Sequence, residues 1–331
     1  MAINLDDVTP HVVTADPANK IWLFYGETGT RKTSVSCRFP NHLLLAYDMG
    51  FNFINGAMPV PMQDWASFKD VVRQLELPKN KNRFDVIIID TVGQAYQSCY
   101  QFMCRQMGVS SPGEAGKYGI GWKKIRNEFE TTIRSIAQKG YGVILLAHSD
   151  ENETVDDATK QVVVQTKIDI DKRPNMIAQQ MSDFVFYLRK EARDGTTDEP
   201  TVYAYTNLLN IDTKCRPRDF VPRFEFTYEN LCHELEVAVA KQYAREGLEM
   251  PDSMASKNYF EIEQVNFETL RNDVRDLAIA LNEQHEHEVS ELLLNMFKGV
   301  SLSELTASPD TIASLQVALA TFKEWKAKYN V

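Results

Sequence analysis

The feature that most constrains this chain is a short segment, Gly26-Glu-Thr-Gly-Thr-Arg-Lys-Thr33, directly after the apolar run at residues 21–25. The segment fits the pattern G-x-x-x-x-G-K-[ST] except that Arg31 stands where the pattern has its second glycine. The apolar run predicts a strand and Lys32 begins an expected helix, which is the setting in which such a loop binds phosphate. The alternative is a strand–helix turn that binds nothing.

A loop of this kind holds phosphate through backbone N–H groups and the partial positive charge of a helix N-terminus. We expect the Lys32 ammonium to reach the β- and γ-phosphates and the Thr33 hydroxyl to ligate Mg²⁺. A Cβ at position 31 strains the loop if a glycine conformation is required there. Alternatively, the loop is rearranged and Arg31 contacts phosphate or a neighbouring subunit. The nucleotide-binding candidates are Gly26, Glu27, Thr28, Gly29, Thr30, Arg31, Lys32 and Thr33.

A second acidic motif follows, in which the apolar residues 86–89 lead to Asp90 and Thr91. A buried strand that ends in an aspartate delivers a carboxylate to the Mg²⁺ shell of a phosphate loop. Many buried strands end in Asp, so the pattern gains its meaning from its place after the loop. We expect Thr33 and Asp90 to meet at the carboxyl edge of one sheet and to hold Mg²⁺ together.

Two further strand ends carry candidate catalytic side chains. Asp48 follows the apolar run at residues 43–47 and is a candidate for orienting the attacking water, or else a capping or turn aspartate. His148 follows the run at residues 143–147 and is a candidate sensor of the γ-phosphate, or else a strand-end histidine bonded to backbone. The catalytic candidates are therefore Lys32, Asp48, Asp90 and His148.

The spacing of apolar runs predicts an α/β fold. Continuous apolar runs are typical of strands that are buried on both faces, and helical patterns at residues 65–75 and 122–137 lie between them. Such alternation predicts a parallel central sheet, with residues 184–188 and 202–206 as an edge hairpin joined by a turn at residues 193–195. We expect an N-terminal arm at residues 1–19, the α/β domain at 20–230 and a helical C-terminal region at 231–331.

Composition excludes several classes of protein. The 331 residues have a formal net charge of −10, which argues against broad electrostatic adhesion to nucleic acid or an anionic membrane but allows a local basic patch. The five cysteines form no CxxC pair, which favours reduced thiols over disulfides or a zinc site. Without an apolar N-terminal segment or membrane span, the chain is expected to be cytoplasmic, in the host cytoplasm if a phage encodes it.

Four segments in this order resemble the phage RecA-like, AAA-type ATPases of the Sak type, which act in single-strand annealing and recombination. They are the loop at residues 26–33, the turn at 48–50, the strand and acid at 87–91, and the strand end at 145–148. The resemblance covers residues 20–225 and implies a RecA-like P-loop core that binds ATP and Mg²⁺. It also implies assembly of identical subunits into a ring or filament.

The resemblance further implies contacts that the residues alone do not establish. A basic segment after the hairpin is expected to reach the nucleotide of the next subunit and to neutralise charge there. The candidates for this finger residue are Lys214, Arg216 and Arg218. Residues 150–176 are expected to face single-stranded DNA, with Lys160, Lys167, Lys172 and Arg173 as candidates, although a solvated face is the favoured interpretation of each lysine taken alone. Tyr118 and Trp122 lie among basic residues and are candidates for base stacking, although core packing is the favoured interpretation of Trp122.

The sequence therefore predicts an ATPase that acts on single-stranded DNA in recombination or replication. A nucleotide-dependent binding module with little turnover is the alternative, because Arg31 departs from the loop pattern. A third interpretation is a loading protein whose C-terminal helices grip a partner, such as a single-strand-binding or annealing protein.

Overall fold

The computed structural model describes residues 11–81, 83–155, 162–192, 200–208, 211–250 and 266–329. The strands are β1 (Ile21–Gly26), β2 (His42–Ala46), β3 (Pro59–Pro61), β4 (Val86–Asp90), β5 (Gly142–Ala147), β6 (Ser149–Val155), β7 (Val162–Ile168), β8 (Phe184–Glu191), β9 (Thr201–Tyr205), β10 (Lys214–Cys215) and β11 (Arg223–Glu225). The helices are α1 (Lys32–Ser36), α2 (Trp65–Gln74), α3 (Pro78–Lys81), α4 (Val92–Met107), α5 (Ile120–Gln138), α6 (Lys172–Met181), α7 (Tyr228–Glu246), α8 (Phe267–Phe297) and α9 (Pro309–Tyr329).

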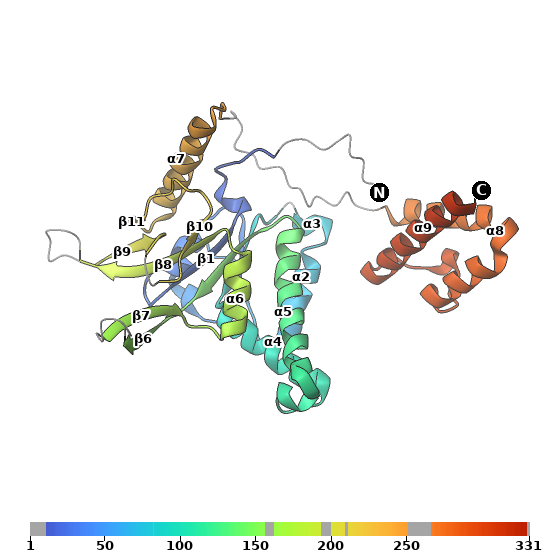
Figure 1. The fold of residues 1–331 in the computed structure, drawn as a ribbon, viewed down its shortest axis with the longest axis horizontal. Helices are drawn as coiled ribbons and strands as arrows, with labels where there is room; N and C mark the ends of the chain where they lie inside the picture. Colours follow the sequence, from blue (N-terminus) through green and yellow to red (C-terminus); the bar gives the residue numbers. More distant parts are fainter. Residues whose placement is uncertain are drawn as a thin grey trace. The chain divides into compact units, whose positions relative to one another are not determined.

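One mixed sheet dominates the fold (Figure 1). Among the described residues its strand order is β11-β9-β8-β1-β5-β4-β2-β3, and β10 also pairs with β8. The strands from β8 through β3 are parallel to their neighbours, whereas β9 and β10 are antiparallel to β8. The predicted fold class is confirmed: an α/β core with a parallel central sheet, helices on the sheet and a helical C-terminal region.

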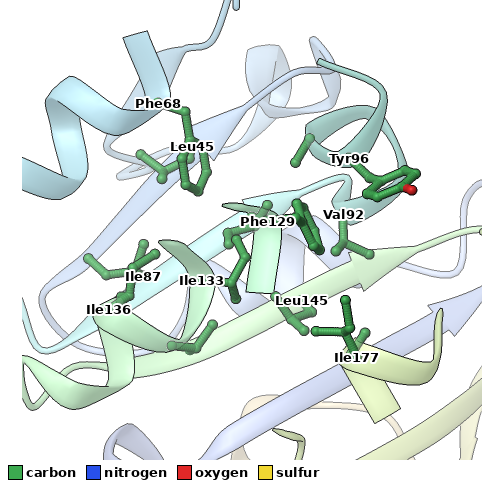
Figure 2. Packing of buried hydrophobic residues seen from close by; sticks show 14 of the residues in the cluster. Leu45, Phe68, Ile87, Val92, Tyr96, Phe129, Ile133, Ile136, Leu145 and Ile177 are labelled. Atoms are coloured by element: carbon green, nitrogen blue, oxygen red, sulfur yellow. The ribbon is translucent and has the colours of Figure 1, made fainter. Parts of the chain in front are cut away.

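Both faces of the sheet are buried, which explains why its central strands are continuous apolar runs. On one face, Leu45, Ile87 and Leu145 pack against Phe68 of α2 and Phe129 of α5 (Figure 2). The opposite face presents side chains such as Trp22 and Phe24 to the apolar residues of α7. Alternate side chains along each strand therefore pack into two separate cores, one on each side of the sheet.

The C-terminal helices form a compact unit of their own, Glu261–Val331. Its core is made by α8 and α9, and it includes the fully buried side chains of Val274, Leu281, Leu315 and Phe322. Where two helices were expected at residues 267–281 and 289–297, α8 is continuous except at His285, whose backbone is not helical.

The division between the two units falls later than the expected 230/231 boundary. The first unit runs Met1–Phe260 and contains α7, because Leu231, Leu235 and Val239 are buried against the sheet. The apolar spacing of α7 predicts a helix with one buried side, but that spacing does not reveal which core the side joins. The sheet domain is thus larger than its sequence motifs indicate.

Several elements inside the first unit were not expected from sequence, and two of them adjoin the candidate site. Helix α4 occupies Val92–Met107, and β6 and β7 form a two-stranded antiparallel ribbon where a loop was expected. The turn expected at residues 193–195 lies outside the described residues. Both unexpected elements begin directly after a predicted site residue, α4 after Asp90 and Thr91, and β6 after His148. They therefore leave the sheet at the edge that carries the candidate site.

Candidate functional site

The loop between β1 and α1 begins at a point of close backbone contact. Gly26 pairs with Leu188 of β8, and a Cβ built on Gly26 would lie 2.2 Å from the Leu188 carbonyl oxygen. Real Cβ contacts are never so short, so a glycine is required for β8 to run this close to the loop. The first glycine of the motif thus has a packing role in addition to opening the turn.

The Lys32 side chain folds back into the loop and binds three of its residues. Its ammonium donates to the carbonyl oxygens of Gly26 at 2.8 Å and Glu27 at 2.9 Å, and to the Thr30 hydroxyl at 3.2 Å. Burial lowers the Lys32 pKa to about 8, and Asp90 acts in the opposite direction. The side chain is 7% exposed, so its charge is poorly solvated and an anion in the loop would stabilise it.

Asp90 and Thr33 meet as the sequence predicted. The Thr33 hydroxyl donates to Asp90 Oδ2 at 2.7 Å, although the two residues are far apart in the chain. Burial raises the pKa of the Asp90 carboxyl, and Asp48 raises it further, while Thr33, Lys32 and His148 lower it. The Asp90 carboxylate therefore lies within electrostatic reach of the other three catalytic candidates.

Asp48 and His148 flank this pair from neighbouring strands. Asp48 is exposed and accepts a hydrogen bond from the Met49 N–H at 2.7 Å, which is the contact of a turn aspartate. His148 is half-buried, and its carbonyl oxygen accepts from the Asp169 N–H at 2.8 Å. Asp48 can therefore be a water-orienting residue or a turn aspartate, and His148 can be a phosphate sensor or a strand-end histidine.

Arg31 adopts the left-handed conformation that the missing glycine would adopt, with φ 58° and ψ 20°. A left-handed conformation costs a non-glycine residue about 1–2 kcal/mol. The arginine therefore occupies this position in a conformation that glycine adopts at less cost. Its side chain is exposed, and it has no ion pair with any described residue.

The residues at this edge fit a magnesium ion. Mg²⁺ prefers oxygen ligands and usually takes one or two from the protein, with water and phosphate supplying the others. Thr33 and Asp90 provide a hydroxyl and a buried carboxylate 2.7 Å apart. Within the described part of the chain, no group of three or more His, Cys, Asp or Glu residues could hold a metal ion, so an all-protein cage is not present there.

The structure adds one basic residue that sequence reasoning missed. Lys190, near the end of β8, donates to the Thr28 carbonyl oxygen at 3.2 Å, and its charge lowers the pKa of Lys32. No motif marks this lysine, because its place depends on β8 running beside β1 and past its end. Only the predicted pairing of these two strands could have pointed to it.

The finger candidates lie at the opposite edge of the sheet. Lys214 pairs with Val185 in the first half of β8, roughly 10 Å along the strand from the residue beside Gly26. The Lys214 ammonium donates to the Ser182 carbonyl oxygen at 2.6 Å, and Arg216 forms an ion pair with Asp183 at 2.6 Å. Arg218 is exposed. The structure does not bring these residues to the loop of their own subunit.

The DNA candidates are only partly described. Lys167 on β7 and Lys172 at the start of α6 are exposed, whereas Lys160 and the side chain of Arg173 lie outside the described residues. Tyr118 is 98% exposed, and the half-buried Trp122 packs its ring 5.8 Å from that of Tyr100. This contact agrees with core packing as the favoured interpretation of Trp122.

A strand–loop–helix turn with a buried lysine, joined by a hydroxyl and a strand-end carboxylate, defines a P-loop nucleotide-binding protein. The chain belongs to the AAA domain family, whose model matches residues 18–216. That match spans the loop, Asp48, Asp90 and His148. Nucleotide binding is the property that the fold, the site and the family share.

One curated relative is similar over nearly the whole chain. It is the SPbeta prophage-derived uncharacterized protein YorG of Bacillus subtilis (strain 168), which is 28% identical over 337 residues, covering 99% of this chain and 100% of the relative. The similarity therefore extends through the C-terminal helices, beyond the region that the family model matches.

Two solved structures show weaker likeness. The flagellar accessory protein FlaH from Methanocaldococcus jannaschii gives a TM-score of 0.36 at 10% identity, covering 64% of this chain and 86% of FlaH. The RadB recombinase gives 0.33 at 11% identity, covering 57% and 80% of the two chains. Both scores are low, so the family match and the geometry of the site carry the assignment. Among the described helices, none combines the length and apolar character needed to cross a bilayer.

Proposed function

We propose that this protein binds ATP with Mg²⁺ and hydrolyses it while acting on single-stranded DNA in phage recombination or replication, as the Sak-type ATPases do. The observation that carries the proposal is the meeting of Lys32, Thr33 and Asp90 at one sheet edge, within hydrogen-bond or electrostatic reach of one another. Lys32 and the loop amides hold the phosphates, and Thr33 and Asp90 hold the metal ion, which neutralises charge on the phosphates when bound.

Asp48 and His148 have separate roles in this mechanism. Asp48 is exposed beside the Asp90 carboxylate, where it orients the attacking water. His148 senses the terminal phosphate and leads directly into the ribbon of β6 and β7. The hydrogen bond from the Asp169 N–H to the His148 carbonyl ties the far end of the ribbon to the same residue. A movement of His148 would therefore shift both the start of β6 and the end of β7.

Two elements that extend from the carboxyl edge of the sheet, the ribbon of β6 and β7 and helix α4, support DNA binding at this edge. The ribbon leaves the sheet after His148, and α4 leaves it after Thr91. Helix α4 runs antiparallel to α5, since Tyr96 contacts Phe129 and Tyr100 contacts Trp122. The connection between the two helices, which carries Tyr118, therefore lies beyond the edge that holds the loop.

The chemistry of that connection suits single-stranded nucleic acid. Tyr118 is almost fully exposed in a left-handed conformation with φ 60°, a strained state for a bulky residue and one that is often kept for function. Exposed Lys117, Lys123 and Lys124 lie on either side of it in the sequence. An aromatic platform with flanking cations binds stacked bases and their phosphates without base-specific contacts.

The C-terminal unit favours a second candidate, a nucleotide-dependent loading module with little turnover. Its surface exposes Ile279, Leu294 and Val317, which are 62%, 60% and 55% exposed, on helices that have a separate core. Such side chains suit contact with a partner protein, for example a single-strand-binding or annealing protein. In either case, Lys214, Arg216 or Arg218 acts on the nucleotide of a neighbouring subunit, in a ring or filament.

A steady-state phosphate-release assay with and without single-stranded DNA tests the proposal. We expect release by the wild type, stimulation by DNA, and loss of both release and nucleotide affinity in Lys32→Ala. Nucleotide binding without release would favour the loading module. If Lys32→Ala bound nucleotide as tightly as the wild type, the assignment of the loop would be wrong.

A further inference from the structure

Lys190 reaches the phosphate loop from a strand that no motif marks. Strand β8 is parallel to β1 and continues past it, with Leu188 beside Gly26 and Lys190 two residues further on. Side chains two apart share one face of a strand. Leu188 lies in the same core as Val35 of α1, so Lys190 projects on the face of the sheet that carries the loop and its helix.

The Lys190 ammonium lies against the first half of the loop. It donates to the Thr28 carbonyl oxygen at 3.2 Å, and a Cβ built on Gly29 would lie only 2.7 Å from its nitrogen. Gly29 has φ +81°. The glycine therefore both permits the turn and leaves the space that the ammonium occupies. Lys32 approaches the loop from inside the fold, whereas Lys190 approaches from the exposed side.

The local charges favour an anion at this point. Lys190 donates to the Thr28 carbonyl oxygen and Lys32 to that of the adjacent Glu27, so two ammonium groups lie against neighbouring residues of the loop and repel each other. Among the described residues, no carboxylate lies within ion-pair distance of Lys190. The adjacent Glu191 forms an ion pair with Arg223 at 2.6 Å. A polyanion in the loop would neutralise both lysines at once.

We propose that Lys190 is a second phosphate-binding cation, supplied to the loop by the same subunit. The proposal rests on the proposed function, because the anion is the polyphosphate of the bound nucleotide. A basic residue of this kind stabilises negative charge on the phosphates, and it does so whether it comes from the same subunit or from a neighbour. Lys214 and Arg216 lie at the opposite edge, whereas Lys190, like Lys32, contacts the loop of its own subunit.

The test compares Lys190→Gln with Arg189→Gln. Arg189 is exposed on the same strand but faces the other side, so its replacement removes the same charge without touching the loop. The probes are a non-hydrolysable ATP analogue and ADP, each with Mg²⁺, titrated into the full chain by calorimetry. We expect Lys190→Gln to weaken the binding of the ATP analogue about tenfold, as the loss of a hydrogen bond to a charged group does. Lys190→Arg should retain most of the affinity.

Three results would overturn the proposal in distinguishable ways. If Lys190→Gln bound the ATP analogue within twofold of Arg189→Gln, Lys190 would not contact phosphate, although the proposed function would stand. If the wild type bound neither probe, or Lys32→Ala bound both as well as the wild type did, the proposed function would fail as well.

The third result concerns the source of the cation. Mixed assemblies of Lys190→Gln and Lys32→Ala subunits should release phosphate no faster than Lys190→Gln subunits do alone if Lys190 acts within its own subunit. Recovery would show that Lys190 acts on a neighbour.

Discussion

Arg31 has a Cβ atom but adopts a backbone conformation that favours glycine. Its φ of 58° places it in the left-handed region at the N-terminus of α1. The sequence predicted that a Cβ would strain this position, and the structure shows that the loop accepts it. If turnover is low, the exposed Arg31 side chain and the strain of its left-handed backbone are the two features of this residue that would explain it.

Arg31→Gly should raise the free energy of unfolding by about 0.5–1 kcal/mol, because relief of left-handed strain outweighs the added entropy of the unfolded chain. Urea denaturation measures this change as a higher midpoint with an unchanged slope. Arg31→Ala is the matched control, because it removes the charge but keeps the Cβ. Equal stability of the two variants would contradict the strain argument. If both variants changed phosphate release to the same extent, the loss of the guanidinium would explain that change.

Lys32 should make nucleotide affinity depend on pH. In the ligand-free protein its pKa is lowered to about 8, so the ammonium is lost as the pH rises through that value. Bound phosphate favours the charged form, and binding must then take up a proton. Affinity should fall about eightfold between pH 7.5 and 9, as the charged fraction of a group with this pKa falls. In Lys32→Arg the guanidinium stays charged, so the profile should be flat. A flat wild-type profile would contradict the lowered pKa.

At the scale of elements, the sequence predicted the central strands of the sheet and the residues at their ends. Continuous apolar runs identify strands that are buried on both faces, and parallel strands bring their carboxyl ends together. This reasoning led to Asp90 and His148 at one edge. Helix α4 was missed because polar Gln residues interrupt its apolar pattern, and the ribbon was missed because β6 is mostly polar. Lys190 depends on register between strands, which no single sequence displays.

The connection between α4 and α5 should separate DNA binding from stability. Tyr118 is 98% exposed, so Tyr118→Ala should change the free energy of unfolding by less than about 0.5 kcal/mol. Loss of base stacking should weaken binding of single-stranded DNA about tenfold, measured by fluorescence anisotropy. Tyr118→Phe keeps the ring and should bind as the wild type does. Unchanged affinity of Tyr118→Ala would remove this connection from the DNA-binding face.

At the scale of the whole molecule, two compact units have separate cores. The first holds the sheet, α7 and the phosphate loop, and the second holds α8 and α9. Sequence periodicity predicted helices in both regions but placed the boundary before α7. The two divisions differ because the pattern of an amphipathic helix shows that one side is buried, but not which core that side joins. The loop at residues 26–33 and the four catalytic candidates therefore all lie in the first unit.

Nucleotide should stabilise the first unit selectively. A ligand at one hundred times its dissociation constant adds about 2.7 kcal/mol to the free energy of unfolding of the structure that binds it. In scanning calorimetry, an ATP analogue with Mg²⁺ should raise the midpoint of the transition of the first unit and leave that of the C-terminal unit in place. Lys32→Ala should abolish the shift.

A matched pair of core variants assigns the two transitions. Phe322 and Phe129 are both buried, in the C-terminal unit and the first unit respectively. Replacing either with alanine should cost its own unit about 3–5 kcal/mol. Phe322→Ala should lower only the transition that nucleotide does not move, with nucleotide affinity unchanged within twofold. If Phe322→Ala instead lowered the nucleotide-sensitive transition, the two cores would be energetically coupled, and the C-terminal helices would contribute to the stability of the nucleotide-binding unit.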